Sequence, residues 1–203
     1  MRSEQPIALV YHGSAEDYVD GTLVWGVNLT EAEQAQQDWD AFRAEMRELG
    51  IAVDEKERDH IHWDWRRKAT SLKRFNGEGQ NWRLAGILSE EQWQGLMILW
   101  LNKLGRLESK PLVYVDYLMS APWNRPVTPR PRFRGVGQRL IRAAIEESQK
   151  LGYAGRIALH SLPEAEEFYA EKCGMTDFGS DSTYYDLCYF ELTAEQAERF
   201  LNP

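Results

Sequence analysis

The hydrophobic pattern of the first half of the chain predicts strands around one long helix. Residues 7–11 and 22–27 are short apolar runs bounded by turn residues, which is typical of strands. Thr30 and Glu33 have the spacing of a capping box, and they predict a helix that runs until Gly50 ends it. The expected apolar stripe of this helix is Trp39, Phe42, Met46 and Leu49.

The middle of the chain combines a charged helical segment with strands. Residues 54–74 are charged and rich in Trp and His, and we expect a helix there. Residues 82–87 and 93–101 predict a strand pair around a Ser-Glu-Glu-Gln turn. Residues 112–119, Leu-Val-Tyr-Val-Asp-Tyr-Leu-Met, form the clearest strand. An irregular connection follows because of four prolines: Pro122, Pro126, Pro129 and Pro131.

An amphipathic helix is predicted over 136–151, with Gly152 as its end. Its apolar face is Val136, Leu140, Ile141, Ala144, Ile145, Ser148 and Leu151. A short strand follows at 156–160. Pro163 then opens a further helix, at the position where its missing N–H costs nothing, and Gly174 closes it.

The chain ends with a predicted strand over 184–192 and a helix capped by Thr193 and Gln196. The second half thus reads strand, loop, helix, strand, helix, strand, after pairs of strands with an antiparallel pattern. This order predicts a mixed α/β or α+β fold with a sheet of about six or seven strands. Its 203 residues suit a single domain, 1–203.

Composition narrows the class of function. Asp and Glu number 32 against 24 Lys and Arg, a formal net charge of −8, which argues against nucleic acid as a partner. The sequence shows neither a signal peptide nor a membrane-spanning run, so we expect a cytoplasmic protein with no membrane partner. Cys173 and Cys188 fit no disulfide or zinc pattern, and we expect reduced thiols.

Arginine is concentrated on one turn of this acidic chain. Residues 117–145 contain six arginines and no acidic residue, and they surround the segment 132–137, Arg-Phe-Arg-Gly-Val-Gly. Glycines at the start of a helix leave backbone N–H groups unpaired and let a ligand approach, and the helix dipole adds positive potential. Guanidinium groups bind phosphate well. The segment therefore predicts a site for a phosphorylated ligand.

The spacing of this segment excludes two common phosphate-binding motifs and favours a third. A Rossmann motif needs another glycine and a later acidic residue, and a Walker loop needs Gly-Lys-Ser/Thr; the segment has neither pattern. The spacing Arg132-x-x-Gly135-x-Gly137, after a strand and before an amphipathic helix, resembles the pyrophosphate loop of the GNAT superfamily of N-acetyltransferases. Residues 165–175, Ala-Glu-Glu-Phe-Tyr-Ala-Glu-Lys-Cys-Gly-Met, are similar to the family's Ala-x-x-Phe-Tyr-x-x-x-Gly-Phe element, with Met175 in place of the aromatic residue.

The resemblance covers about residues 80–192, which would be the acetyl-CoA-binding core of the domain. It implies a mostly antiparallel sheet flanked by helices, with a central pair of strands that splay apart. Residues 1–79 match only in outline, as strands and helices that cover the acceptor site, and residues 193–203 would add a C-terminal helix.

The resemblance also implies how acetyl-CoA would bind. Backbone N–H groups of the loop would hold its pyrophosphate with two arginines nearby, and pantetheine would bond to the 112–119 strand like an added strand. An N–H of Met119 or Ser120 would polarise the thioester carbonyl. The implied cofactor-binding residues are Leu118, Met119, Ser120, Arg132, Phe133, Arg134, Gly135, Val136, Gly137 and Gln138.

Catalysis in such proteins is direct acetyl transfer to an amine in a ternary complex, without a metal. By resemblance, Tyr169 would protonate the departing thiolate, since its ordinary pKa near 10 keeps it a proton donor. Asp116 is the expected base for the acceptor amine, and His160 is a rival base. Each also has a structural interpretation: a packed aromatic, a solvent-facing strand residue and a hydrogen-bonded histidine.

The sequence departs from the family in three places. Phe133 stands where the family has its first loop glycine, and Leu162 stands where it often has Asn. The piece between Ser120 and Arg132 is longer than usual and is a candidate lid.

The acceptor side is less defined. The stretch 59–65, with His-x-His between carboxylates, allows a metal site, but a helix would separate the imidazoles and no further His or Cys cluster accompanies them. We instead expect Trp63 and Trp65 to pack on the sheet or line the acceptor pocket, and His62 or Asp64 to touch a small-molecule or peptide amine.

Three questions stay open from the sequence. One rival is a CoA-binding regulatory or inactive protein of the same fold, and another is a nucleotide-binding protein of a different fold. The length of the acyl group on the donor is not defined. Exposed tryptophans would favour a homodimer.

Overall fold

The computed structural model describes residues 2–11, 17–51, 64–77, 81–125, 128 and 131–202, with the backbone alone over 73–77. The chain divides into two compact units. The first comprises 1–96 and 119–137, and the second comprises 97–118 and 138–203.

The first unit is built on antiparallel strands. They are β1 (Ser3–Tyr11), β2 (Tyr18–Trp25), β3 (Trp82–Ser89), the start of β4 (Gln92–Leu104) and the two-residue β6 (Phe133–Arg134). β1 pairs with β2 on one side and with β6 on the other, and β2 pairs with β3. Glu90 and Glu91 join β3 to β4 with positive φ angles of 50° and 60°, as a tight two-residue hairpin turn requires. The predicted strand pair around this turn is confirmed.

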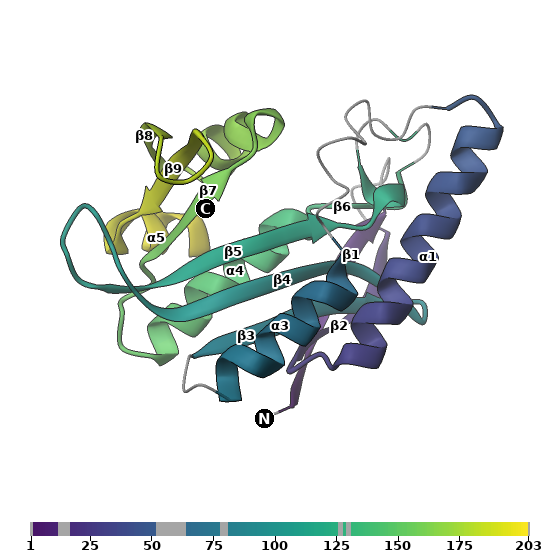
Figure 1. The fold of residues 1–203 in the computed structure, drawn as a ribbon, viewed down its shortest axis with the longest axis horizontal. Helices are drawn as coiled ribbons and strands as arrows, with labels where there is room; N and C mark the ends of the chain where they lie inside the picture. The colour runs from purple at the N-terminus through teal and green to yellow at the C-terminus, as the bar shows by residue number, and fades with distance from the viewer. Residues whose placement is uncertain are drawn as a thin grey trace. The chain divides into compact units, whose positions relative to one another are not determined.

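Two helices of the first unit, α1 (Leu29–Glu48) and α3 (Trp65–Gly77), lie side by side (Figure 1). The start of α1 differs from the prediction, because Asn28 and Glu31 form the capping box, not Thr30 and Glu33. The Asn28 side chain accepts the Glu31 N–H at 3.0 Å, and the Glu31 carboxylate accepts the Asn28 N–H at 2.8 Å. Asn is as good an N-cap residue as Thr, and β2 ends at Trp25, early enough for Asn28 to be the N-cap of α1.

The buried stripe of α1 also lies nearer its start than expected. Ala32, Ala35 and Trp39 are buried, whereas Leu49 is 64% exposed. The Trp39 indole N–H donates to the Trp93 carbonyl at 3.0 Å, so this buried polar group is paired.

The second unit contains most of β5 (Pro111–Ser120), together with β7 (Ile157–Ser161), β9 (Leu187–Leu192) and β8 (Thr176–Asp181). β5 and β7 are parallel, and β7, β9 and β8 pair antiparallel in that order. The sequence predicted neither β8 nor the late start of β9. Residues 182–186 are a turn rather than the start of a strand, and Tyr185 and Asp186 have φ angles of 58° and 57° there.

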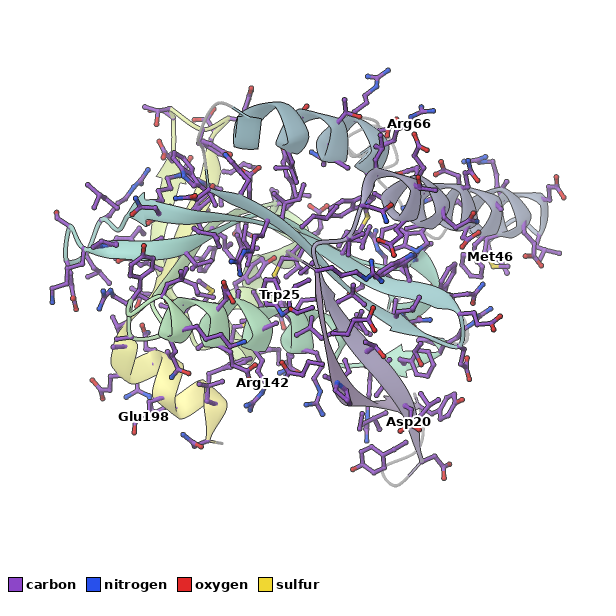
Figure 2. All side chains as sticks on the ribbon, turned by 90° about the horizontal axis from the view of Figure 1, so that it is seen from below. Asp20, Trp25, Met46, Arg66, Arg142 and Glu198 are labelled. Carbon is purple, nitrogen blue, oxygen red and sulfur yellow. The ribbon has the colours of Figure 1, made fainter. Side chains whose placement is uncertain are left out.

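Helices α4 (Val136–Lys150) and α5 (Ala194–Leu201) belong to the second unit apart from the first residues of α4. The predicted apolar face of α4 is buried, except for the half-buried Leu151, and Gly152 ends the helix with a φ of +79°. The predicted Thr193 and Gln196 capping box of α5 is confirmed. Arg142 of α4 donates to the Leu201 carbonyl of α5 at 2.8 Å, and Figure 2 shows it beside that helix.

The predicted helix after Pro163 is not a regular α-helix. A 3₁₀ turn, η2 (Pro163–Ala165), leads into a π-helical segment, η3 (Phe168–Lys172), in which Cys173 N–H donates to the Phe168 carbonyl at 3.1 Å. Gly174, with a φ of +65°, closes it as predicted.

Taken together, the described residues form one mostly antiparallel sheet in the order β6-β1-β2-β3-β4-β5-β7-β9-β8, so the predicted mixed α/β class is confirmed. It has nine strands rather than six or seven, because β6 and β8 were not expected. Within the described residues no helix is long and apolar enough to cross a membrane. Tryptophans of the described chain are buried or half-buried, so they do not supply the exposed surface that would favour a homodimer.

The cap of α1 gives a test of this fold. Asn28→Ala removes one side of the capping box and leaves helix N–H groups unpaired, so it should lower the free energy of unfolding by about 1 kcal/mol. Thr30→Ala, on the box expected from sequence, should change it by less than about 0.5 kcal/mol. Chemical denaturation of both variants measures the difference, and equal losses would contradict the observed cap.

Candidate functional site

The turn before α4 combines a left-handed glycine with open backbone N–H groups. Gly135 has a φ of +76°, a left-handed conformation that favours glycine. The N–H groups of Val136, Gly137 and Gln138 have no acceptor among the described residues, and no acidic residue occupies the first turn. Arg134, before this turn, is exposed. The start of α4 therefore offers open donors and positive charge to an anion.

Two of the predicted loop residues are engaged elsewhere in the first unit. The Phe133 ring is buried 5.0 Å from the Tyr11 ring, and its N–H already donates to the Asn124 side chain at 3.0 Å. The Arg132 guanidinium donates to the Gln92 side chain and lies over the Trp123 ring, 5.0 Å from its centre. Of the two arginines, Arg134 is thus the one whose side chain has no partner in the described chain.

In the second unit, β5 and β7 pair over a short length only. The register joins Val113–Val115 to Ile157–Leu159, three residue pairs, although β5 continues to Ser120 and β7 to Ser161. Antiparallel pairing with β9 accompanies β7 along its whole length. The predicted splayed pair is therefore seen as a parallel ladder that ends at Val115. Asp116 and Leu118 follow on β5, and both are half-buried.

Tyr169 lies on the π-helical segment η3. It is 8% exposed, and its ring is 6.0 Å from that of Phe190. The hydroxyl has no hydrogen-bond partner among the described residues. Burial raises the pKa of this phenol above its ordinary value, with the neighbouring Cys173 adding to the effect, so Tyr169 is protonated at neutral pH. Cys173 and Cys188 are free thiols, as expected.

His160 lies in a polar cluster of the second unit and is almost closed to solvent, with its side chain 3% exposed. Nδ1 lies 2.6 Å from the Tyr114 hydroxyl and Nε2 lies 3.0 Å from Asp181 Oδ2. Hydrogen bonds from the Thr183 hydroxyl, His160 and Arg106 lower the Asp181 pKa, so this ionised carboxylate can only accept. Nε2 therefore carries the proton, and Nδ1 accepts from the Tyr114 O–H.

Burial is the main cause that lowers the His160 pKa below its ordinary value, and it outweighs the hydrogen bond that His160 donates to Asp181, which acts in the opposite direction. The nearby charge of Lys103 also lowers it. His160 is consequently neutral at pH 7, with both ring nitrogens already in hydrogen bonds.

Asp116 is linked to the same cluster. Its Oδ1 accepts the Tyr184 hydroxyl at 3.2 Å, and the Tyr184 ring stacks on His160 with centres 4.0 Å apart and an angle of 18° between the planes. The Lys103 ammonium lies 3.5 Å from the centre of the Tyr114 ring. Burial lowers the pKa of Lys103, and the charge of Asp116 counteracts part of this effect.

Several members of this cluster were missed in the sequence. Tyr114 could have been found, because it shares a strand face with Asp116. Arg106 and Tyr184 come from turns, where no periodicity marks a residue as part of a site, and Asp181 ends β8, a strand that the sequence did not predict.

The predicted acceptor residues are only partly placed. His62 and Trp63 lie outside the described residues. Asp64 caps α3: it accepts the Arg67 N–H at 3.0 Å, and its carboxylate forms an ion pair with Arg66 at 3.3 Å. Its contact with an acceptor stays a prediction. In the described part of the chain, no group of three or more His, Cys, Asp or Glu could hold a metal ion.

The buried imidazole predicts a pH dependence of stability. The folded state binds a proton on His160 more weakly than the unfolded chain does. The contribution of the neutral imidazole to the free energy of unfolding is therefore complete above about pH 6.5 and is lost as the pH falls below that value. Asp181 affects stability in a lower pH range. Because its pKa is depressed in the folded state, the ionised carboxylate stabilises the fold until the pH falls below about 4. Denaturation at about pH 7.5 and pH 5 should show a smaller loss of stability in His160→Gln than in the wild type. Parallel losses would mean that His160 is not the responsible group.

Comparisons with known proteins identify the fold. No protein-family model and no curated protein matches the sequence. A Desulfovibrio desulfuricans protein assigned to the GNAT family of acetyltransferases aligns with a TM-score of 0.58 at 8% identity, over 86% of this chain and 99% of its own. The PaiA N-acetyltransferase of Thermoplasma acidophilum, solved with coenzyme A, gives 0.53 at 13% identity, over 83% and 97%.

A third structure, the Salmonella typhimurium acetyl transferase that modifies the N-terminal serine of a 50S ribosomal subunit protein, aligns with a TM-score of 0.53 at 10% identity. It covers 84% of this chain and 94% of its own. At these identities the likeness concerns the architecture. The chain has the fold of the GNAT-family acetyltransferases.

Proposed function

We propose that this protein is an N-acetyltransferase that moves an acetyl group from acetyl-CoA to an amine. The observation that carries the proposal is the start of α4, where three open N–H groups follow Gly135 and no acidic side chain opposes an anion. A diphosphate needs such donors, and the fold is that of acetyltransferases. The acceptor is a small-molecule or peptide amine, and the overall charge of −8 favours one that is neutral or cationic.

The coenzyme's pyrophosphate would be held by the N–H groups of Val136, Gly137 and Gln138, with Arg134 contributing charge. Gly135 lets the backbone reach this conformation, while Arg132 and Phe133 support the turn through their own contacts. Pantetheine would bond to the backbone of β5 from Leu118 to Ser120, with an N–H of Met119 or Ser120 directed at the thioester carbonyl.

Tyr169 is the proposed general acid. A phenol whose pKa is raised by burial holds its proton at neutral pH, and its hydroxyl is not committed to another group of the described chain. It would give its proton to the thiolate of CoA as the C–S bond breaks.

Asp116 is the proposed general base, in preference to His160. Both nitrogens of His160 are already hydrogen-bonded, so it could take a proton only by displacing Tyr114. The acceptor ammonium would lose one proton to Asp116, and the neutral amine would attack the thioester carbon. The nitrogen loses a second proton to solvent as the tetrahedral intermediate collapses, and Tyr169 regains from solvent the proton that it gave to the thiolate, while Asp116 releases the first. The products are an amide, CoA and one released proton.

Binding and transfer test this function together. CoA should raise the melting temperature, while NAD and ATP should not. With acetyl-CoA, a peptide bearing a free terminal amine and a simple polyamine should each be tried, and release of the CoA thiol measured with a disulfide reagent. Stabilisation by CoA without any release would identify a CoA-binding protein that lacks the reaction. No stabilisation by CoA would overturn the proposal.

Tyr169→Phe tests the general acid. Loss of the proton donor should lower kcat by about two orders of magnitude and leave the affinity for acetyl-CoA nearly unchanged. Tyr153→Phe, a half-buried tyrosine after α4, is the matched control and should keep wild-type turnover. Equal turnover of Tyr169→Phe and the wild type at saturating substrates would remove Tyr169 from the mechanism.

A further inference from the structure

Tyr184 connects the proposed base to the polar cluster of the second unit. Its hydroxyl donates to Asp116 Oδ1 at 3.2 Å, while its ring stacks on His160 with centres 4.0 Å apart. The turn that carries it is fixed by backbone bonds: Tyr184 N–H donates to the Asp181 carbonyl at 2.9 Å, and Leu187 N–H donates to the Tyr184 carbonyl at 3.1 Å. Both ends of this side chain are thus held, the phenol by a carboxylate and the ring by an imidazole.

The imidazole under Tyr184 has little freedom of its own. Tyr114 and Asp181 occupy its two nitrogens, and it is closed to solvent. Asp181 is in turn held by the Arg106 guanidinium and by the Thr183 hydroxyl at 2.6 Å. These hydrogen bonds are part-buried, and such a chain restricts motion, because each group that moves would leave another unpaired. His160 and Asp181 therefore form a frame that fixes the ring of Tyr184.

Charged and titratable groups of several elements surround Asp116. Lys103 of β4 is near enough for the Asp116 charge to affect its pKa. Tyr114 and Tyr117 on β5 have pKa values raised mainly by burial, with Asp116 contributing, and the same holds for Tyr184 from the turn. His160 of β7, neutral at pH 7, lies on the far side of the Tyr184 ring. Among these groups Tyr184 has its hydroxyl on the carboxylate itself.

We propose that Tyr184 is a positioning residue for catalysis: it orients the Asp116 carboxylate and favours its ionised form, so that this group can accept the proton of the acceptor amine. The inference rests on the proposed acetyltransferase function. It assigns His160, with Asp181, to the frame that holds Tyr184 rather than to proton transfer. Tyr184 itself gives up no proton, since its raised pKa keeps the hydroxyl intact throughout.

The substitution Tyr184→Phe isolates the hydroxyl, because phenylalanine keeps the ring that stacks on His160. A hydrogen bond to the ionised form lowers a carboxyl pKa, so its loss should move the acidic limb of the kcat–pH profile upward by about half to one unit. Loss of orientation should lower kcat on the plateau by about tenfold, while KM for acetyl-CoA stays the same. The melting temperature should change little.

Tyr185→Phe is the matched control, since Tyr185 is the next residue in the same turn and is 90% exposed. It should keep the wild-type limb and plateau. Asp116→Asn should abolish the acidic limb together with most of the activity. The inference would be overturned if the acidic limb of the kcat–pH profile stays in place in Tyr184→Phe. It would also be overturned if Asp116→Asn keeps the wild-type kcat–pH profile.

A measurement independent of turnover separates this inference from the proposed function. Carbon NMR of the labelled Asp116 carboxyl, assigned with Asp116→Asn, gives its titration directly in the wild type and in Tyr184→Phe. An upward shift in Tyr184→Phe shows that the hydroxyl controls the carboxylate, and equal titration disproves it. If the wild type transfers no acetyl group to either amine probe, the catalytic role fails with the proposed function, whatever the titration shows.

Discussion

The short parallel ladder between β5 and β7 is the constraint on which the chemistry of the second unit depends. Pairing ends at Val115 and Leu159, while β7 keeps its antiparallel partner β9. Backbone groups cannot stay unpaired without cost, so the edge of β5 past this ladder would suit the pantetheine chain of the proposed function, which adds as a strand. Asp116 is the first residue past the last pair. The end of the β5–β7 ladder thus places the Asp116 carboxylate next to the strand edge at which the pantetheine chain is proposed to bind.

The polar cluster explains how that carboxylate can be held past the end of the ladder with β7. His160, Asp181 and Tyr184 come from β7, β8 and the following turn, and their hydrogen bonds and stacking join these segments. Burying an imidazole and a carboxylate costs desolvation, which the ion pair with Arg106 and the Thr183 hydroxyl offset. A fully satisfied network of this kind restricts geometry more than an apolar core would, because its bonds are directional.

Sequence reasoning predicted those parts of the fold that local physics determines. The face of α4 follows from helical periodicity, and Gly135, Gly152 and Gly174 take the left-handed conformations expected at helix boundaries. Strand β8 could not be predicted, because Thr176–Asp181 carries a polar run with Gly179 and a register shift that resemble a loop. Its pairing is determined by β9, a partner that no local pattern reveals. The frame around His160 was missed for the same reason, since its hydrogen bonds join residues distant in sequence.

At the turn before α4, the proposed phosphate site, the structure explains a departure from the family's motif. Phe133 stands where the family has a glycine, and its place in the fold accounts for this difference. As part of β6 it pairs with Tyr11 of β1, its ring is buried, and its N–H donates to the Asn124 side chain. A residue that completes a strand needs no left-handed freedom, so glycine is required only from Gly135 onward, where the strand gives way to the helix. Arg132 and Arg134 flank this residue and look equivalent in sequence. Stacking on Trp123 commits Arg132 to the support of the turn and leaves Arg134 as the charge available to a phosphate.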